Sequence, residues 1–165
     1  MPETTVVAGR RTALPWLGVA AAIVVLDQIT KIWVMSVFQP YETLPVTPFF
    51  NLVLVFNTGA AFNFLADAGG WQKWFFVVLA AAICVWLYTL LRAHAQERAL
   101  PLAAAGIMGG AVGNVIDRLR IDRVIDFIQV HWAGWYFPAF NVADSAITLG
   151  VALMLWQQFR HGEAN

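Results

Sequence analysis

Three aspartates, Asp117, Asp126 and Asp144, lie in or beside long apolar segments of this chain. A carboxylate near hydrocarbon costs roughly 2.5–3.5 kcal/mol on insertion scales, so such a residue is usually present for a function. Two carboxylates that come together can share one proton and activate a water molecule. The aspartates therefore predict aspartyl hydrolase chemistry, provided that the fold brings two of them to one place.

The other polar residues offer few alternative nucleophiles or metal ligands. Neither serine, Ser36 or Ser145, lies in a nucleophile-elbow motif. The three histidines lack a metal-binding spacing, and the HExxH motif is absent. The single cysteine, Cys84, stands in an uncharged apolar run and is expected to be a buried small side chain. We therefore expect no metal and no cofactor.

Two of the aspartates also have structural explanations. Asp144 follows Asn141 by three positions, which is the spacing of a capping box at the start of a helix. That role is compatible with catalysis, because a helix N-terminus also stabilises a carboxylate. Asp126 stands between apolar neighbours with no capping role, and an ion pair with Arg123 or Arg118 is its structural alternative.

The remaining aspartates are interpreted mainly as structural. Asp117 adjoins Arg118 and follows Asn114 by three positions, which favours an ion pair or a hydrogen bond. Asp27 and Lys31 have the i, i+4 spacing of a helical salt bridge. For that pair the sequence leaves a structural role and a substrate-positioning role equally open.

Composition places the chain in the membrane. Of its 165 residues 60% are hydrophobic and only 12% are charged, a balance that a soluble domain would not carry. The net charge is zero with no basic run, so nucleic-acid binding is not supported.

Four segments are long enough to cross a bilayer, and we expect one integral membrane domain over residues 1–165. Four crossings put both termini on one side, and the arginines near the chain ends favour the cytoplasm for that side. Segments 39–73 and 117–141 would then be extracytoplasmic. The expected crossings are residues 13–38, 74–91, 99–116 and 142–157.

Two extracytoplasmic stretches, 49–57 and 124–130, are rich in β-branched and aromatic residues and predict strands. The fold class is therefore a membrane all-α bundle of four transmembrane helices with a small extracytoplasmic β-sheet. Small residues spaced by four in the third segment indicate close helix packing. An interfacial aromatic belt is expected from Trp71, Trp74, Trp132, Trp135, Tyr136 and Phe137.

Five short motifs resemble the bacterial lipoprotein signal peptidase (signal peptidase II) family. They are LDQITK at 26–31, NTGAAF at 57–62, GNVIDRL at 113–119, VIDF at 124–127 and FNVADS at 140–145. The resemblance covers nearly the whole chain. It implies an aspartic endopeptidase of the cytoplasmic (inner) membrane that acts near the extracytoplasmic face.

The resemblance also implies a substrate and a set of site residues. The substrates would be lipidated prolipoproteins, cleaved on the amino side of a diacylglyceryl-modified cysteine, with membrane lipid as the surroundings and the enzyme as a monomer. The catalytic pair falls on Asp126 and Asp144, with Asp117 structural. The supporting or substrate-binding residues fall on Asp27, Lys31, Asn57, Gly59, Asn114, Arg118 and Asn141.

Two other classes of function compete with a peptidase. A small transporter with a coupling carboxylate would more often hold that carboxylate near the bilayer midplane, whereas these aspartates cluster at the outer ends of the segments. A non-catalytic membrane scaffold would tolerate replacement of Asp126.

Overall fold

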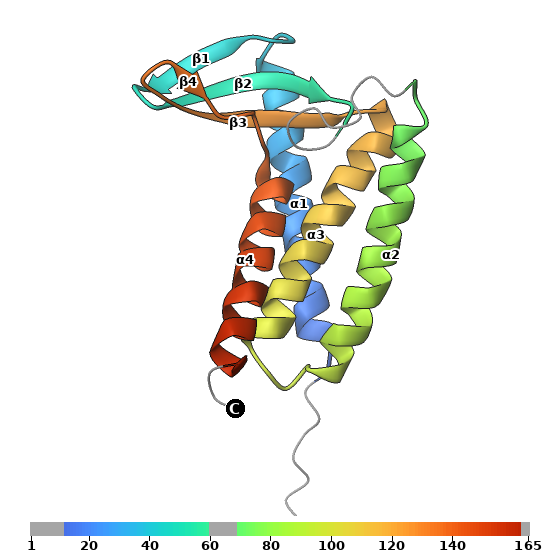
Figure 1. The fold of residues 1–165 in the computed structure, drawn as a ribbon. Helices are drawn as coiled ribbons and strands as arrows, with labels where there is room; N and C mark the ends of the chain where they lie inside the picture. Colours follow the sequence, from blue (N-terminus) through green and yellow to red (C-terminus); the bar gives the residue numbers. More distant parts are fainter. Residues whose placement is uncertain (1–11, 60–68, 163–165) are drawn as a thin grey trace, which may run out of the picture.

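The computed structural model describes residues 12–59 and 69–162. Four long helices lie side by side in one bundle, and a small sheet covers one end of it (Figure 1). The first described residues and the end of the last helix both lie at the opposite end of the bundle. The helices are α1 (Leu14–Val37), α2 (Gln72–Ala93), α3 (Ala99–Ile121) and α4 (Val142–Gly162).

The described residues form three helices that are long and apolar enough to cross a membrane, namely α1, α2 and α3. Their outward faces remain apolar, and large side chains such as Ile29, Trp33 and Val78 are about half exposed or more. In water such a surface would be unfavourable, but it suits a hydrocarbon surrounding. The fourth helix packs along α3, and its crossing of the membrane stays a prediction.

The central helix of the bundle is α3, which packs against each of the other three helices (Figure 1). Small residues allow this close approach. A Cβ atom added at Gly109 would lie 2.7 Å from the Ala20 carbonyl oxygen of α1. One added at Gly110 would lie 2.7 Å from the Ile147 side chain of α4. The predicted packing role of these glycines is thus confirmed on both faces of α3.

Helix α3 extends beyond the point where the sequence predicts the end of the apolar segment. Helix α3 runs to Ile121, five residues beyond the expected boundary at 116, and Asp122 then adopts a left-handed conformation with φ of 62°. The charged residues Asp117 and Arg118 are both buried inside the protein, so they do not end the helix. Their side chains consequently project from a regular helix into the sheet end of the bundle.

The sheet has four antiparallel strands in the order β1-β2-β3-β4. The two predicted strands form its centre, while β1 and β4 were not predicted. In the register of β2 and β3, Val55 lies opposite Asp126 and Asn57 lies opposite Val124. The strands are β1 (Thr43–Thr47), β2 (Phe50–Asn57), β3 (Val124–Trp132) and β4 (Trp135–Tyr136).

An apolar cluster joins the sheet to the end of α1. Val34 and Phe38 of α1 pack with Leu54 of β2 and with Ile125 and Phe127 of β3. Each of these side chains is at most 7% exposed, so the cluster excludes water. Burial of five large apolar side chains fixes β3 against the helices. The residue between Ile125 and Phe127 is therefore held in a defined place.

Candidate active site

The residue between them is Asp126, which β3 holds almost fully buried, with 2% of its surface exposed. Its Oδ1 accepts a hydrogen bond of 2.7 Å from the Asn141 side-chain amide, and its Oδ2 accepts one of 3.3 Å from Asn57. The ion pair proposed as its structural alternative is wrong for the described residues. Arg123 instead lies over the Phe56 ring. Asp126 thus has amide donors and no cation in direct contact.

The second aspartate, Asp144, lies in the first turn of α4. The Asn141 side-chain oxygen accepts a hydrogen bond of 2.8 Å from the Asp144 backbone N–H. In return Asp144 Oδ2 accepts one of 3.3 Å from the Asn141 backbone N–H. This is the predicted capping box. The other carboxylate oxygen accepts a hydrogen bond of 2.8 Å from Asn114 Nδ2 of α3, so Asp144 also takes part in the site.

Asn141 connects the two carboxylates. It caps α4 beside Asp144, while its side-chain amide donates to Asp126. The preceding residue, Phe140, exchanges backbone hydrogen bonds with Ile128 and so ties the start of α4 to β3. Backbone pairing therefore brings the aspartates of a strand and a helix to the two sides of one asparagine.

The surroundings of Asp126 favour its protonated form. Burial, followed by the negative charge of nearby Asp144, raises the pKa of Asp126 from 3.8 to about 7. Hydrogen bonds from Asn57 and Asn141, together with the charge of Lys31, act in the opposite direction. Desolvation prevails because no cation contacts the carboxylate. A neutral Asp126 beside an accessible Asp144 is the arrangement that acid–base catalysis by two carboxyl groups requires.

Arg118 extends the site toward β2. Its Nη2 donates a hydrogen bond of 2.7 Å to the carbonyl oxygen of Gly59. The Gly59 N–H in turn donates to Asn57 Oδ1 at 2.9 Å, which orients the amide that contacts Asp126. The guanidinium group lies 4.7 Å from the centre of the Phe76 ring of α2. Gly59 and Arg118 thus support the position of Asn57, and residues 60–62 of that motif lie outside the described residues.

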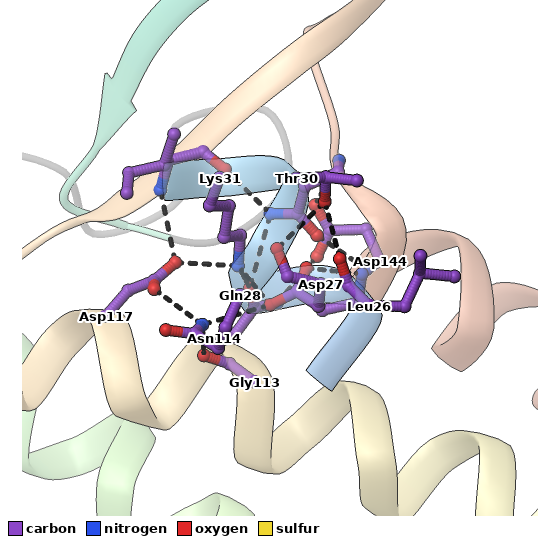
Figure 2. Close-up of polar contacts among 12 residues, drawn as sticks. Leu26, Asp27, Gln28, Thr30, Lys31, Gly113, Asn114, Asp117 and Asp144 are labelled. Atoms are coloured by element: carbon purple, nitrogen blue, oxygen red, sulfur yellow. Dashed lines mark hydrogen bonds and ion pairs between the residues drawn. The ribbon is translucent and has the colours of Figure 1, made fainter. Parts of the chain in front are cut away.

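A buried polar cluster around Lys31 lies next to Asp144, to which Asn114 connects it (Figure 2). Lys31 Nζ of α1 lies 2.8 Å from Asp27 Oδ2 and 2.6 Å from Asp117 Oδ2 of α3. It also donates a hydrogen bond of 3.0 Å to Asn114 Oδ1. The predicted i, i+4 salt bridge is present. Asp117 makes the predicted structural ion pair, but its partner is Lys31 of α1 and not the adjacent Arg118.

Two further contacts tie this cluster to the rest of the site. Asp27 Oδ1 accepts a hydrogen bond of 2.9 Å from the Ala143 backbone N–H and so anchors the first turn of α4. Gln28, which sequence reasoning missed, donates to Asp117 at 2.9 Å and to Asp27 at 3.2 Å (Figure 2). A polar residue beside Asp27 in an apolar helix was the available signal. Every expected site residue therefore lies in one connected network at the sheet end of the bundle.

The chain matches known proteins over most of its length. The family model described as signal peptidase (SPase) II matches residues 19–160. The chain belongs to the signal peptidase II family. It is 57% identical over 160 residues to the lipoprotein signal peptidase of Azoarcus sp. (strain BH72), covering 94% of this chain and 91% of that protein. It is 52% identical to the lipoprotein signal peptidase of Janthinobacterium sp. (strain Marseille), with 89% of each chain covered.

Two solved structures share the fold of this chain. Two bacterial membrane enzymes determined by the in meso method superimpose with TM-scores of 0.83 and 0.76. The first is 29% identical and covers 92% of this chain and 91% of that chain. The second is 30% identical and covers 87% and 92%. The chain is thus a signal peptidase of type II and, with its long apolar helices, a multi-pass protein of the inner membrane.

Proposed function

We propose that this chain is an aspartic endopeptidase that removes the signal peptide from prolipoproteins, with Asp126 and Asp144 as its catalytic dyad. The observation that carries the proposal is the bridge made by Asn141, which contacts both carboxyl groups from its place at the start of α4. The dyad needs no metal and no cofactor for this reaction. We take the chain to act as a single domain and as a monomer.

The two carboxyl groups have different surroundings and take different roles. We assign the ionised state to Asp144, which is partly exposed and accepts hydrogen bonds from Asn114 and Asn141, so that it removes a proton from a water molecule as the water oxygen attacks the scissile carbonyl carbon. Asp126 is buried and protonated, and it donates its proton to the developing oxyanion. Asp144 then passes its proton to the leaving nitrogen as the C–N bond breaks. Asp126 recovers its proton when the new carboxyl group forms.

Nearby hydrogen-bond donors would position the substrate. The side chains of Asn57, Asn114 and Arg118 are donors that surround the dyad without adding negative charge. Donors of this kind can hold the carbonyl oxygens of an extended substrate close to the reacting atoms. A prolipoprotein substrate agrees with the name of the relatives, lipoprotein signal peptidase, and we expect cleavage on the amino side of its diacylglyceryl-modified cysteine.

The proposed membrane topology has four crossings, with both termini in the cytoplasm. The start of α1 and the end of α4 both lie at the end of the bundle opposite the sheet, which supports an even number of crossings (Figure 1). The sheet and the dyad would then lie at the extracytoplasmic face, where exported substrates and water are available. Exposed aromatic side chains at this end support an interfacial position: Trp71, Trp74, Trp132, Trp135 and Tyr136.

The test is cleavage of a synthetic peptide that carries a diacylglyceryl cysteine, by the purified chain in detergent. We expect cleavage before the modified cysteine and no cleavage by Asp126→Asn or Asp144→Asn, both of which should remain folded. The matched control is Asp122→Asn, which alters an exposed carboxylate at the end of α3 and should retain activity. Appreciable turnover by either dyad variant would exclude the aspartyl mechanism.

The same variants separate the competing classes. A peptide without lipid tests whether the modified cysteine is recognised. A transporter would instead show pH-coupled flux in liposomes and no cleavage. A scaffold would show neither activity, and it would tolerate Asp126→Asn.

A further inference from the structure

Lys31 lies at the centre of the site network but contacts neither catalytic aspartate. Only 1% of its surface is exposed, so it cannot touch a substrate. Its ammonium group has three acceptors: Asp27 at 2.8 Å, Asp117 at 2.6 Å and Asn114 at 3.0 Å (Figure 2). An ammonium group has three N–H donors, so each donor has an acceptor and the group is fixed in place.

Stability alone explains this lysine poorly. Removing a cation and its carboxylates from water costs several kcal/mol per ion, and apolar replacements of buried ion pairs are often neutral or stabilising. A buried cation at this place is better explained by what it does to a neighbouring group.

That neighbour is Asn114, whose amide has to face in one direction. Its Oδ1 faces Lys31 at 3.0 Å, and its Nδ2 donates to Asp144 Oδ1 at 2.8 Å. A rotated amide would bring its NH₂ group against an ammonium group and its oxygen against a carboxylate. Lys31 has no acceptor and an ionised Asp144 has no donor, so both contacts would become repulsive.

A second donor supports the same orientation less firmly. The Asn141 amide also donates to Asn114 Oδ1, at 3.2 Å. The same nitrogen lies 3.2 Å from the Ile125 carbonyl oxygen and 2.7 Å from Asp126 Oδ1. A nitrogen with only two protons cannot serve three acceptors fully. The charged Lys31 is therefore the main determinant of the Asn114 amide orientation.

We propose that Lys31 is a positioning residue, which fixes the amide of Asn114 so that Asn114 holds the Asp144 carboxylate ready to act as the base. The proposal rests on the proposed function, because it assigns a role within that reaction. Under this proposal other residues position the substrate. Lys31 acts on the Asp144 carboxylate through one intermediate residue, Asn114.

The test has to separate this role from simple charge balance. Lys31→Met alone would leave Asp27 and Asp117 as two buried carboxylates without a cation. Adding Asp117→Asn keeps the formal charge of the group that Lys31, Asp27 and Asp117 form. The unaltered group has one cation and two carboxylates, and the double variant has one carboxylate, so both carry a single net negative charge. Asp27 retains its hydrogen bond from Ala143 in that double variant. Asp117→Asn alone is the matched control, because it keeps the contact between Lys31 and Asn114.

The measurements are kcat, KM and the pH profile of kcat for the lipidated peptide in detergent, together with the melting temperature. We expect Lys31→Met/Asp117→Asn to lose roughly 10- to 100-fold in kcat relative to Asp117→Asn, the value of one hydrogen bond to a charged group. KM should change little. The acid limb of the profile should move to higher pH, because the hydrogen bond from Asn114 and the charge of Lys31 both favour an ionised Asp144 and the variant weakens both. The other groups that face Asp144 are the Asn141 backbone and the charges of Arg118, Asp126 and Asp27, and the variant leaves all of these in place.

Addition of Asn114→Ala decides whether Lys31 acts through that residue. If it does, Asn114→Ala should lower kcat strongly in the Asp117→Asn background and very little in the Lys31→Met/Asp117→Asn background. The inference would be overturned if Asn114→Ala and Lys31→Met lowered kcat by independent factors that multiply. It would also be overturned if a folded Lys31→Met/Asp117→Asn variant had the kcat and the pH profile of Asp117→Asn. In both of those results the unaltered enzyme still cleaves. Absence of cleavage by the unaltered enzyme would overturn the proposed function and this inference with it.

Discussion

Replacement of Asp126 by asparagine should stabilise this protein at alkaline pH while it removes catalysis. Burial and the charge of Asp144 raise the pKa of Asp126 from 3.8 to about 7. Between these two values the folded protein retains a proton that the unfolded chain releases. Stability therefore falls as pH rises through this window and levels off above about pH 7, where the buried carboxylate is ionised. The asparagine side chain does not ionise in this pH range, so the stability of the variant does not fall in this way.

The size of the effect follows from the shift. About three pKa units correspond to roughly 4 kcal/mol of stability lost between acid and alkaline pH. The variant avoids that loss, but its NH₂ group cannot accept the hydrogen bond from Asn57, which costs about 1 kcal/mol. We therefore expect Asp126→Asn to be more stable by about 3 kcal/mol at pH 8 and slightly less stable at pH 4. For a chain of this length the gain at pH 8 corresponds to roughly 6–12 °C in Tm.

The assay is thermal unfolding in detergent at both pH values, followed by the fluorescence of the eight tryptophans. Asp122→Asn is the matched control, because its carboxylate is 75% exposed and asparagine also accepts the left-handed backbone at that position. It should show no difference that grows with pH. A variant Asp126→Asn that melts below the unaltered protein at pH 8 would refute the reasoning, as would an equal difference at both pH values.

Three further predictions concern the network and its place in the membrane. Asp117→Asn should keep part of the activity but lose about 3 kcal/mol of stability, because Lys31 loses one of two buried carboxylate partners; thermal unfolding checks this. A reporter fused after Asn165 should report a cytoplasmic location and one inserted at Gly70 an external one, and the reverse pattern would contradict the topology. Infrared difference spectra near neutral pH should show a protonated carboxyl band that disappears in Asp126→Asn and survives in Asp144→Asn.

The sequence pointed to the proposed dyad because the chain has so few polar residues. In an apolar chain each carboxylate calls for an explanation, and Asp126 had no capping role, so the structural alternative that the sequence offered was an ion pair with Arg123 or Arg118. The capping box of Asn141 and Asp144 could be predicted because it depends on spacing within one helix turn. The salt bridge between Asp27 and Lys31 is equally local. Interactions within one turn are the ones that a sequence specifies directly.

The partner of Asp117 could not be found in this way. Adjacent residues on a helix point about 100° apart, so Asp117 and Arg118 face different neighbours although they are consecutive. Asp117 meets Lys31 only because α1 packs against α3, and Arg118 reaches Gly59 after β2. The strands β1 and β4 were missed for a related reason. They are short or interrupted by proline, and their pairing depends on strands that are already in place.

The balance of buried charge explains why one carboxyl group of the dyad should be neutral. The network contains two cations, and both are engaged elsewhere, Lys31 by two carboxylates and Arg118 by a carbonyl oxygen. Neither makes a direct ion pair with Asp126. The four carboxyl groups of the network are those of Asp27, Asp117, Asp126 and Asp144. With all of them ionised the network would carry two uncompensated negative charges, and a single proton halves that excess. Of the two carboxyl groups without a salt bridge, Asp126 and Asp144, Asp126 is the more buried, so Asp126 gains most from protonation.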